Sequence, residues 1–349
     1  MLLSPALQLL PSLFPYLSLQ EEQQSVQMKE IKRNSSVRSV CYLPGKKQIA
    51  ISFTTTIQIL NLSPLNEAVI DLGKESDRHE QEINSISVSS SERYLASGAD
   101  DNLIKYWDLN KNELIYSFEA FPGLVYCVKF SSDESKVIAC SYTPIIKIFS
   151  FPEGEILSAL QGHRAVIMCL AVDRNFTRCL SASWDHSCRV WNLSSNSCER
   201  ILLDHSGECN AVDISSNGKF GATGADDGKV FLYDLNTGSV LSRFSGHTKM
   251  VVGLSLRMAS DNRFIVSSAS WDGTVRVYEK EGEGRIVARH NHKVATVYFT
   301  PHGEVLFTGS FDGTSRIIDL CSEDRERVFL LIPLFPREIL QNIRYMLFW

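Results

Sequence analysis

The sequence predicts an all-β protein in which one unit repeats along the chain and the copies close into a ring. A four-residue segment that starts with apolar or aromatic residues recurs about every 42 residues. Its copies begin at steps of 47, 42, 42, 42, 45 and 40 residues, at Ile59, Tyr106, Ile148, Val190, Leu232, Val277 and Ile317. Repeats of this length are typical of proteins whose units stack on their neighbours.

Each unit has the pattern of short β-strands. In the fourth unit, the runs Val166–Val172, Thr177–Ser183 and Cys188–Leu193 are rich in apolar and β-branched residues, and the polar segments Asp173–Asn175 and Trp184–His186 separate them. Three such strands and a fourth before the next unit form one four-stranded antiparallel sheet. Because such a sheet cannot bury both of its faces alone, we expect a seven-bladed β-propeller.

A histidine and an aspartate recur at a nearly fixed separation. In the fourth unit His163 precedes the strands, Asp185 lies in the second turn and Trp191 lies on the third strand. The separation is 22 residues in four units and 25 in the sixth, for the pairs His79 and Asp101, His163 and Asp185, His205 and Asp227, His247 and Asp272, and His290 and Asp312. This pattern resembles the WD-repeat (Trp-Asp repeat) family over residues 25–321.

The resemblance implies that these residues form a structural hydrogen-bond chain inside each blade. The implied chains also contain a hydroxyl and an aromatic residue: His79, Ser97, Asp101 and Trp107; His163, Ser181, Asp185 and Trp191; His205, Thr223, Asp227 and Tyr233; and His247, Ser268, Asp272 and Tyr278. A histidine, a hydroxyl and an aspartate also make up a catalytic triad. A catalytic site needs one set in one cleft, so sets that recur around a ring indicate a structural role and no enzyme.

Two units lack these residues. Phe121, Ala139 and Thr143 occupy the histidine, serine and aspartate positions of the third unit, and the first unit has Ala50 and Thr54. Both blades are expected to depend on apolar packing alone, and therefore to be the less rigid part of the ring.

The top face of the ring, where the inner strands begin, is the expected binding surface. Two positions near the start of each inner strand and the residue before the turn aspartate should face solvent there. The expected contact residues are Trp184, Trp271, Phe311, Tyr142, Tyr126, Met168, Met250, Val252, Glu82, Asp100, Glu208 and Asp226. Aromatic and methionine side chains of this kind are typical of interface hot spots. The alternative is that Trp184 and Trp271 lie flat against neighbouring blades and only stabilise them.

The chain divides into an apolar, proline-containing segment at residues 1–24, the propeller at 25–321 and a tail at 322–349. Two segments compete for the outer strand of the last blade, Ser25–Lys32 and Glu326–Ile332. In the tail, Pro336–Trp349 has the pattern of a short amphipathic helix. The start of the chain lacks the basic region and cleavage site of a signal peptide, so we expect a cytoplasmic protein, with a nuclear location or secretion as alternatives.

The amino-acid composition argues against several classes of binding partner. The 35 Lys and Arg residues face 40 Asp and Glu residues, which gives a net charge of −5, and no basic cluster indicates nucleic acid. The nine cysteines are odd in number and contain no C-x-x-C pair, so neither a metal nor another cofactor is expected. No stretch is long and apolar enough for a membrane span.

The sequence therefore favours a scaffold or adaptor that binds a peptide or protein partner within a multiprotein complex. Two alternatives remain open. One is a sensor propeller from a larger ATPase of the NACHT/NB-ARC type, although the chain has no G-x-x-x-x-G-K-[ST] loop. The other is a substrate receptor of a ubiquitin ligase, a class whose usual W-D-x-R motif reads Trp107-Asp108-Leu109-Asn110 here.

Overall fold

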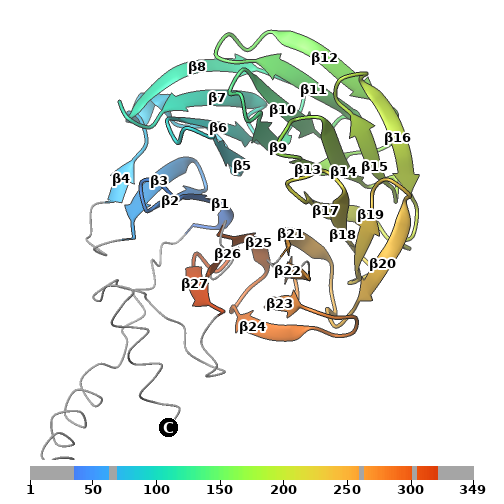
Figure 1. The fold of residues 1–349 in the computed structure, drawn as a ribbon. Coiled ribbons are helices and arrows are strands. Elements are labelled where there is room, and N and C mark those ends of the chain that lie inside the picture. Colours follow the sequence, from blue (N-terminus) through green and yellow to red (C-terminus); the bar gives the residue numbers. More distant parts are fainter. Residues whose placement is uncertain (1–34, 63–68, 259–262, 301–304, 321–349) are drawn as a thin grey trace, which may run out of the picture.

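Seven antiparallel sheets surround a central axis in the computed structural model, which describes residues 35–62, 69–258, 263–300 and 305–320 (Figure 1). Consecutive strands form each sheet, and the first strand of each sheet lies nearest the axis (Figure 1). Six sheets have four strands, and the described part of the seventh has three. The predicted seven-bladed β-propeller is confirmed.

The first four blades cover Val37 to Leu202. Blade 1 contains β1 (Val37–Leu43), β2 (Gln48–Phe53), β3 (Thr56–Asn61) and β4 (Val69–Asp71). Blade 2 contains β5 (Ile83–Val88), β6 (Tyr94–Ala99), β7 (Leu103–Asp108) and β8 (Glu113–Glu119). Blade 3 contains β9 (Val125–Phe130), β10 (Lys136–Ser141), β11 (Ile145–Ser150) and β12 (Ile156–Gln161). Blade 4 contains β13 (Ile167–Val172), β14 (Arg178–Ser183), β15 (Cys188–Asn192) and β16 (Ser197–Leu202).

The remaining three blades continue to Asp319. Blade 5 contains β17 (Cys209–Ile214), β18 (Phe220–Ala225), β19 (Val230–Asp234) and β20 (Ser239–Phe244). Blade 6 contains β21 (Val251–Met258), β22 (Phe264–Ser270), β23 (Thr274–Tyr278) and β24 (Arg285–Arg289). Blade 7 contains β25 (Val294–Phe299), β26 (Val305–Ser310) and β27 (Ser315–Asp319). A short 3-10 helix, η3 (Glu75–Asp77), links blades 1 and 2.

The turn aspartate of each marked blade shapes the hairpin between the second and third strands. In blade 4 the Ser187 backbone N–H donates to the Asp185 carboxylate at 3.0 Å, and His186 between them has a φ of 65°. Glycine adopts this left-handed conformation without steric cost. Blades 5, 6 and 7 accordingly have glycine after the aspartate, as Gly228, Gly273 and Gly313.

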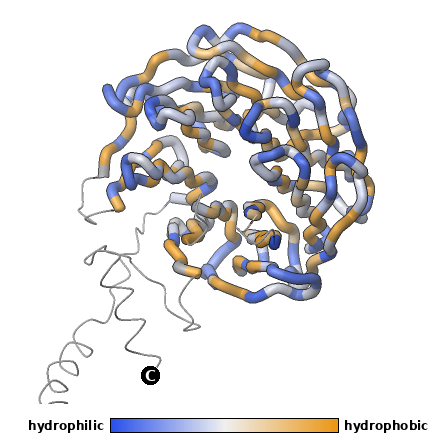
Figure 2. The backbone as a smooth tube through the Cα atoms, viewed as in Figure 1, coloured by the Kyte–Doolittle hydropathy of each residue, from blue (hydrophilic) through white to orange (hydrophobic). Residues whose placement is uncertain are grey.

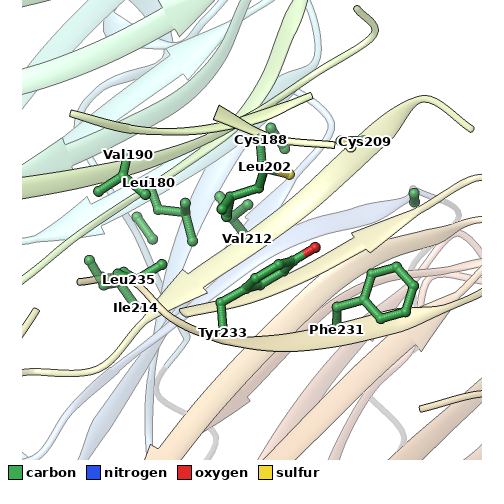
Figure 3. Packing of buried hydrophobic residues seen from close by; sticks show 13 residues of the cluster. Leu180, Cys188, Val190, Leu202, Cys209, Val212, Ile214, Phe231, Tyr233 and Leu235 are labelled. Carbon is green, nitrogen blue, oxygen red and sulfur yellow. The ribbon is translucent and has the colours of Figure 1, made fainter. Parts of the chain in front are cut away.

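The hydrophobic core is divided into layers, most of which lie between neighbouring blades. Figure 3 shows one layer, in which Leu180 and Val190 of blade 4 face Ile214 and Leu235 of blade 5. Hydrophobic and hydrophilic residues are interspersed along every blade (Figure 2), although all six residues of β13 are hydrophobic. Each blade therefore buries its apolar face against the next one, as expected for a repeat that is not stable alone.

Blade 7 meets blade 1 directly, which closes the ring. The Tyr42 ring stacks on Phe307, with 5.6 Å between the ring centroids. Val37 approaches Gly309 so closely that a Cβ at Gly309 would lie 2.6 Å from the Val37 Cγ1 atom. Glycine at position 309 therefore allows β1 to pack against β26.

Several predictions concern segments outside the described residues. These are the apolar segment at 1–24, the competing closing strands 25–32 and 326–332, and the amphipathic helix at 336–349. Which strand completes blade 7 stays a prediction. Within the described ranges, no helix is long and apolar enough to cross a bilayer.

Candidate functional site

A chain of hydrogen bonds crosses blade 4 through His163. Its Nδ1 atom lies 2.8 Å from Asp185 Oδ2, and its Nε2 atom lies 2.7 Å from Ser181 Oγ. A carboxylate only accepts hydrogen bonds, so Nδ1 carries the proton and Nε2 accepts the serine hydroxyl. The Trp191 indole N–H donates to the same Ser181 oxygen at 2.8 Å. Every polar group of this buried chain thus has a partner.

Blade 2 has the same chain. His79 contacts Asp101 at 2.8 Å and Ser97 at 2.7 Å, and the Trp107 indole donates to Ser97 at 2.9 Å. Trp107 is 2 % exposed, so an unpaired indole N–H there would be costly.

Blade 5 departs from the implied chain at its aromatic residue. His205 lies 3.2 Å from Asp227 and 2.8 Å from Thr223, as the resemblance implies. The Tyr233 hydroxyl, however, donates to Asp204 at 3.1 Å. A phenol oxygen extends beyond the position of an indole nitrogen, and it therefore reaches past the threonine to the loop carboxylate.

Blades 6 and 7 vary the chain in other ways. His247 lies 2.8 Å from Asp272 and 2.6 Å from Ser268, and the Tyr278 hydroxyl oxygen lies 3.3 Å from Ser268. In blade 7, both ring nitrogens of His290 contact hydroxyls at 2.9 Å, those of Thr308 and Thr314. Thr314 donates in turn to Asp312 at 2.6 Å, so a hydroxyl relays the contact between His290 and Asp312, which are 3.5 Å apart.

Burial and hydrogen bonding shift the pKa values of the histidines and aspartates in blades 4 and 7. Burial lowers the pKa of His163, and burial together with Arg316 lowers the pKa of His290 to about 4. Burial alone would raise the pKa of Asp185, but hydrogen bonds, including those from Ser187 and His163, outweigh it and lower the pKa to about 2. At neutral pH the histidine is neutral and the aspartate is charged, and neither titrates near pH 7 as a general base would.

Blade 3 replaces the chain with aromatic packing. Phe121 is 2 % exposed and meets Phe149, which occupies the tryptophan position, edge-on with ring centroids 6.0 Å apart. The Lys147 ammonium lies 4.7 Å from the Phe121 ring and donates to the Ala120 carbonyl at 2.8 Å. In blade 1, Ala50 is fully buried and Thr54 is exposed. The lower rigidity expected of both blades stays a prediction.

A β-bulge recurs at the same place in the inner strand of every blade. In each one the register against the second strand shifts by one residue, near the top face. The bulged residues all line one cavity of about 340 Å³ on the propeller axis, and they are Arg38, Asn84, Tyr126, Met168, Asn210, Val252 and Ala295. A bulge changes the direction in which its side chain points. The seven bulged residues together line the mouth of a central channel.

A second set of predicted contact residues surrounds this mouth. The residue before each turn aspartate donates its backbone N–H to the residue before the inner strand, as in Tyr142 to Leu124 at 2.9 Å and Trp271 to Met250 at 3.1 Å. Asp100 pairs in this way with Glu82, and Asp226 with Glu208, both at 2.9 Å. Trp271 and Phe311 also line the channel cavity.

The predicted contact residues therefore fall into two groups. Five of them meet around the channel, namely Tyr126, Met168, Val252, Trp271 and Phe311. The other seven lie outside that lining, namely Trp184, Tyr142, Met250, Glu82, Asp100, Glu208 and Asp226. Tyr142 is the most open aromatic side chain of the set, with 56 % of its surface exposed.

Both predicted tryptophans contact the next blade. The Trp184 indole N–H donates to Asn210 Oδ1 of blade 5 at 3.0 Å. Lys293 of blade 7 places its ammonium 3.6 Å from the centre of the Trp271 ring. Each tryptophan is partly buried. They are thus less exposed than the binding hypothesis assumed, and they take part in packing between blades.

Some acidic residues at the mouth form an ion pair with a basic residue, and others do not. The Arg38 guanidinium of blade 1 forms an ion pair with Glu82 of blade 2 at 2.6 Å. This pair neutralises the Glu82 charge. Glu208 and Asp226 of blade 5 form no ion pair with any residue of the described ranges, and Asp226 accepts a hydrogen bond from Asn210 at 2.6 Å. The uncompensated negative charge of this pair therefore lies at blade 5.

Sequence reasoning missed Arg38 and Lys129. Arg38 lies in the unit that lacks the histidine and aspartate marks, and only the bulge in β1 identifies it as a mouth residue. Lys129 lies deeper in the channel wall, and its place depends on strand alternation around the axis. Across the described part of the chain, no group of three or more His, Cys, Asp or Glu residues is placed to hold a metal ion.

Comparison with known proteins matches this architecture to one family. The model of the WD domain, G-beta repeat, matches six segments, residues 73–108, 112–150, 154–192, 196–234, 238–279 and 284–319. The chain belongs to the WD-repeat family. Blade 1 precedes the matched segments, in agreement with its lack of the marker residues.

Three relatives of this WD-repeat chain show 24–27% sequence identity to it. Autophagy-related protein 16 of Arabidopsis thaliana is 27% identical over 249 residues, which cover 69% of this chain and 48% of the relative. The guanine nucleotide-binding protein subunit beta of Oryza sativa subsp. japonica is 26% identical over 231 residues, 61% of this chain and 60% of the relative. Nuclear distribution protein PAC1 of Arthroderma otae is 24% identical over 282 residues, which cover 71% of this chain and 61% of the relative. The chain thus spans less than two thirds of each of these relatives.

Proposed function

We propose that this WD-repeat propeller is a non-enzymatic scaffold that binds a protein or peptide partner at the mouth of its central channel. The observation that carries the proposal is the ring of bulged residues, which gathers side chains from all seven blades around one cavity. Apolar cavities with a few convergent polar groups are the usual form of a binding site. The name of one relative, a guanine nucleotide-binding protein subunit, describes a component of an assembly and agrees with this role.

Chemistry of the mouth indicates the kind of partner. Tyr126, Met168 and Val252 present an apolar surface, and Tyr142 adds an exposed aromatic ring beside it. Glu208 and Asp226 provide negative charge at blade 5. A segment with an aliphatic or aromatic anchor and a nearby Lys or Arg would complement both features.

Affinity capture with a double variant tests the proposal. Trp271→Ala with Tyr142→Ala removes two aromatic surfaces from the mouth and should lower the recovery of bound partners at least about tenfold, since hot-spot residues commonly contribute more than 1.4 kcal/mol. Quantitative mass spectrometry of the captured proteins measures the recovery. Thermal unfolding shows whether the variant is folded.

The matched control removes apolar surface elsewhere. Ile201 and Leu203 lie at and just beyond the end of outer strand β16 and are 50% and 69% exposed. Ile201→Ala with Leu203→Ala should leave partner recovery unchanged. Equal recovery with both double variants would refute a binding site at the channel mouth, and so would loss in the outer-strand variant alone.

A further inference from the structure

Two cysteines of neighbouring blades meet in the wall of the channel. Cys127 on β9 and Cys169 on β13 directly follow the bulged residues Tyr126 and Met168, and both line the cavity. Both sulfurs lie against the same backbone oxygen, that of Leu170, with Cys127 Sγ at 3.5 Å and Cys169 Sγ at 3.9 Å. The two thiols are therefore neighbours across a blade boundary, in the wall of the cavity that opens at the mouth.

An unpaired cation lies beside the two thiols. Lys129 follows Cys127 by two residues on the same strand and lines the same cavity. No hydrogen bond or ion pair joins its ammonium group to another residue in the described ranges. Burial lowers the pKa of Lys129, but the neighbouring Cys127, Cys169, Cys41 and Asp213 outweigh burial and raise it. Lys129 is therefore positively charged next to the cysteine pair.

These neighbours favour the ionised form of one thiol. The neighbouring Cys169 thiol contributes most to lowering the pKa of Cys127, and Lys129 contributes further against the opposing effect of burial. The pKa of Cys127 falls to about 6, whereas that of Cys169 is raised. The thiolate is the nucleophilic form of cysteine. The pair thus combines a cysteine whose pKa is lowered with a neighbouring cysteine whose pKa is raised.

A second cysteine pair provides an internal comparison. Cys188 and Cys209 also belong to neighbouring blades and pack in one core layer. They are 1% and 0% exposed, and they lie in the core layer with Leu202 and Ala225. Burial raises the pKa of Cys188 well above its usual value. This second pair also spans a blade boundary, but it lies outside the cavity lining that contains Lys129.

We propose that Cys127 and Cys169 form a thiol-modification site at which small hydroperoxides oxidise the pair to a disulfide that joins blades 3 and 4. The Cys127 thiolate attacks one peroxide oxygen, the O–O bond breaks, and the leaving oxygen takes a proton as water or an alcohol. Cys127 is then a sulfenic acid. The Cys169 sulfur attacks it, the S–O bond breaks, and the hydroxide leaves with the Cys169 proton as water. Two thiols lose two electrons, and the peroxide gains them.

Peptide mapping after treatment with hydrogen peroxide tests this site. Trypsin places the two cysteines on separate peptides, residues 112–129 and 165–174, each with a single cysteine. We expect these peptides to appear joined under non-reducing conditions, and to separate when a thiol reductant is added. The Cys188 and Cys209 peptides should stay reduced over the same period. Unchanged thiols at 127 and 169, or oxidation of both pairs at one rate, would overturn the proposal.

Two variants assign the roles of the individual groups. In Cys169→Ser, Cys127 has no thiol to bridge with, so a 1,3-dione probe should trap its sulfenic acid. In Lys129→Met, loss of the Cys127 thiol should slow about threefold near pH 6.5, because a rise of one unit in its pKa from about 6 lowers the thiolate fraction by that factor. An unaltered rate in Lys129→Met, with circular dichroism showing a folded protein, would remove the lysine from the mechanism. A Cys169→Ser protein that does not label at Cys127 would contradict the first step.

Discussion

At the scale of single residues, one hydroxyl holds each complete blade chain together. Ser181 accepts from Trp191 and donates to His163, so two strands and a loop meet at one oxygen atom. All three residues are at least nine-tenths buried, and no water can replace the lost bonds without opening the blade. The repeated histidine, hydroxyl and aspartate therefore stabilise the blade, and the same atoms in a cleft would have suggested catalysis.

Removal of that hydroxyl should destabilise the protein more than its size suggests. Ser181→Ala leaves the Trp191 N–H and the His163 Nε2 atom without partners, and each unsatisfied buried group costs about 1–3 kcal/mol. We expect the free energy of unfolding to fall by about 2–4 kcal/mol in urea titrations. Ser194→Ala on an exposed turn is the control and should change it by less than about 0.5 kcal/mol. A small effect at both positions would contradict the role of the chain.

Single-residue predictions from the sequence succeeded where the contact lies inside one blade. The fixed spacing of His163 and Asp185 was enough, because both contacts depend on local hairpin geometry. Contacts that depend on side-chain length or on the angle between blades were harder to predict. The bond from Tyr233 to Asp204 was not foreseen, and the packing of Trp184 on blade 5 was foreseen only as an alternative, because the spacing contains neither quantity.

At the scale of the strand and the blade, bulges set the form of the binding mouth. A bulge arises from the pairing of two strands, so the pattern of one strand does not reveal it. Three of the seven bulged residues, Tyr126, Met168 and Val252, are nevertheless among the contact residues that the repeat predicts at the start of the inner strands. Arg38 escaped because blade 1 lacks the residues that mark the others.

Blade 3 shows how apolar packing replaces a polar chain. Phe121 belongs to a layer with Phe130 and Phe149, and Phe118 and Phe151 pack against it. We expect Phe121→Ala to cost about 3–5 kcal/mol, as other deletions of buried phenylalanine do, because the ring leaves a cavity between blades 2 and 3. The measurement is the shift in urea midpoint. Phe176→Ala, at a partly exposed turn, should lower the free energy of unfolding less. Equal losses from the two variants would show that the aromatic layer does not stabilise blade 3 more than an ordinary turn residue does.

At the scale of the whole molecule, side chains of one inner strand pair with the backbone of the next. Ser85 accepts from the Val128 N–H at 3.2 Å, and Asp213 accepts from the Leu256 N–H at 2.7 Å. Ser255 accepts from the Phe299 N–H at 3.1 Å. At these three blade boundaries the free edge of one inner strand is thus bonded to its neighbour, which protects an edge that would otherwise be open. The period of the sequence predicts seven blades, but not these links, which form only when the ring is closed.

The link through Asp213 should make the stability of the ring depend on pH. Burial raises the pKa of Asp213 to about 6, despite its hydrogen bonds from Leu256 and Ile214, whereas an unfolded aspartate has a pKa of about 3.9. The folded protein therefore binds the proton more tightly than the unfolded chain. The resulting stability is complete below about pH 4 and is lost as the pH rises through about 6.

Asp213→Asn removes this titration but keeps an oxygen that accepts the Leu256 N–H. Relative to the unaltered protein, the variant should gain about 1 kcal/mol of unfolding free energy between pH 5 and pH 8. Urea titrations of both proteins at the two pH values give the difference. Asp226→Asn, which makes the same substitution at an exposed residue of the mouth, is the control and should show no such gain. A constant difference between Asp213→Asn and the unaltered protein would mean that the carboxylate is charged throughout, and that the links around the channel do not sense pH.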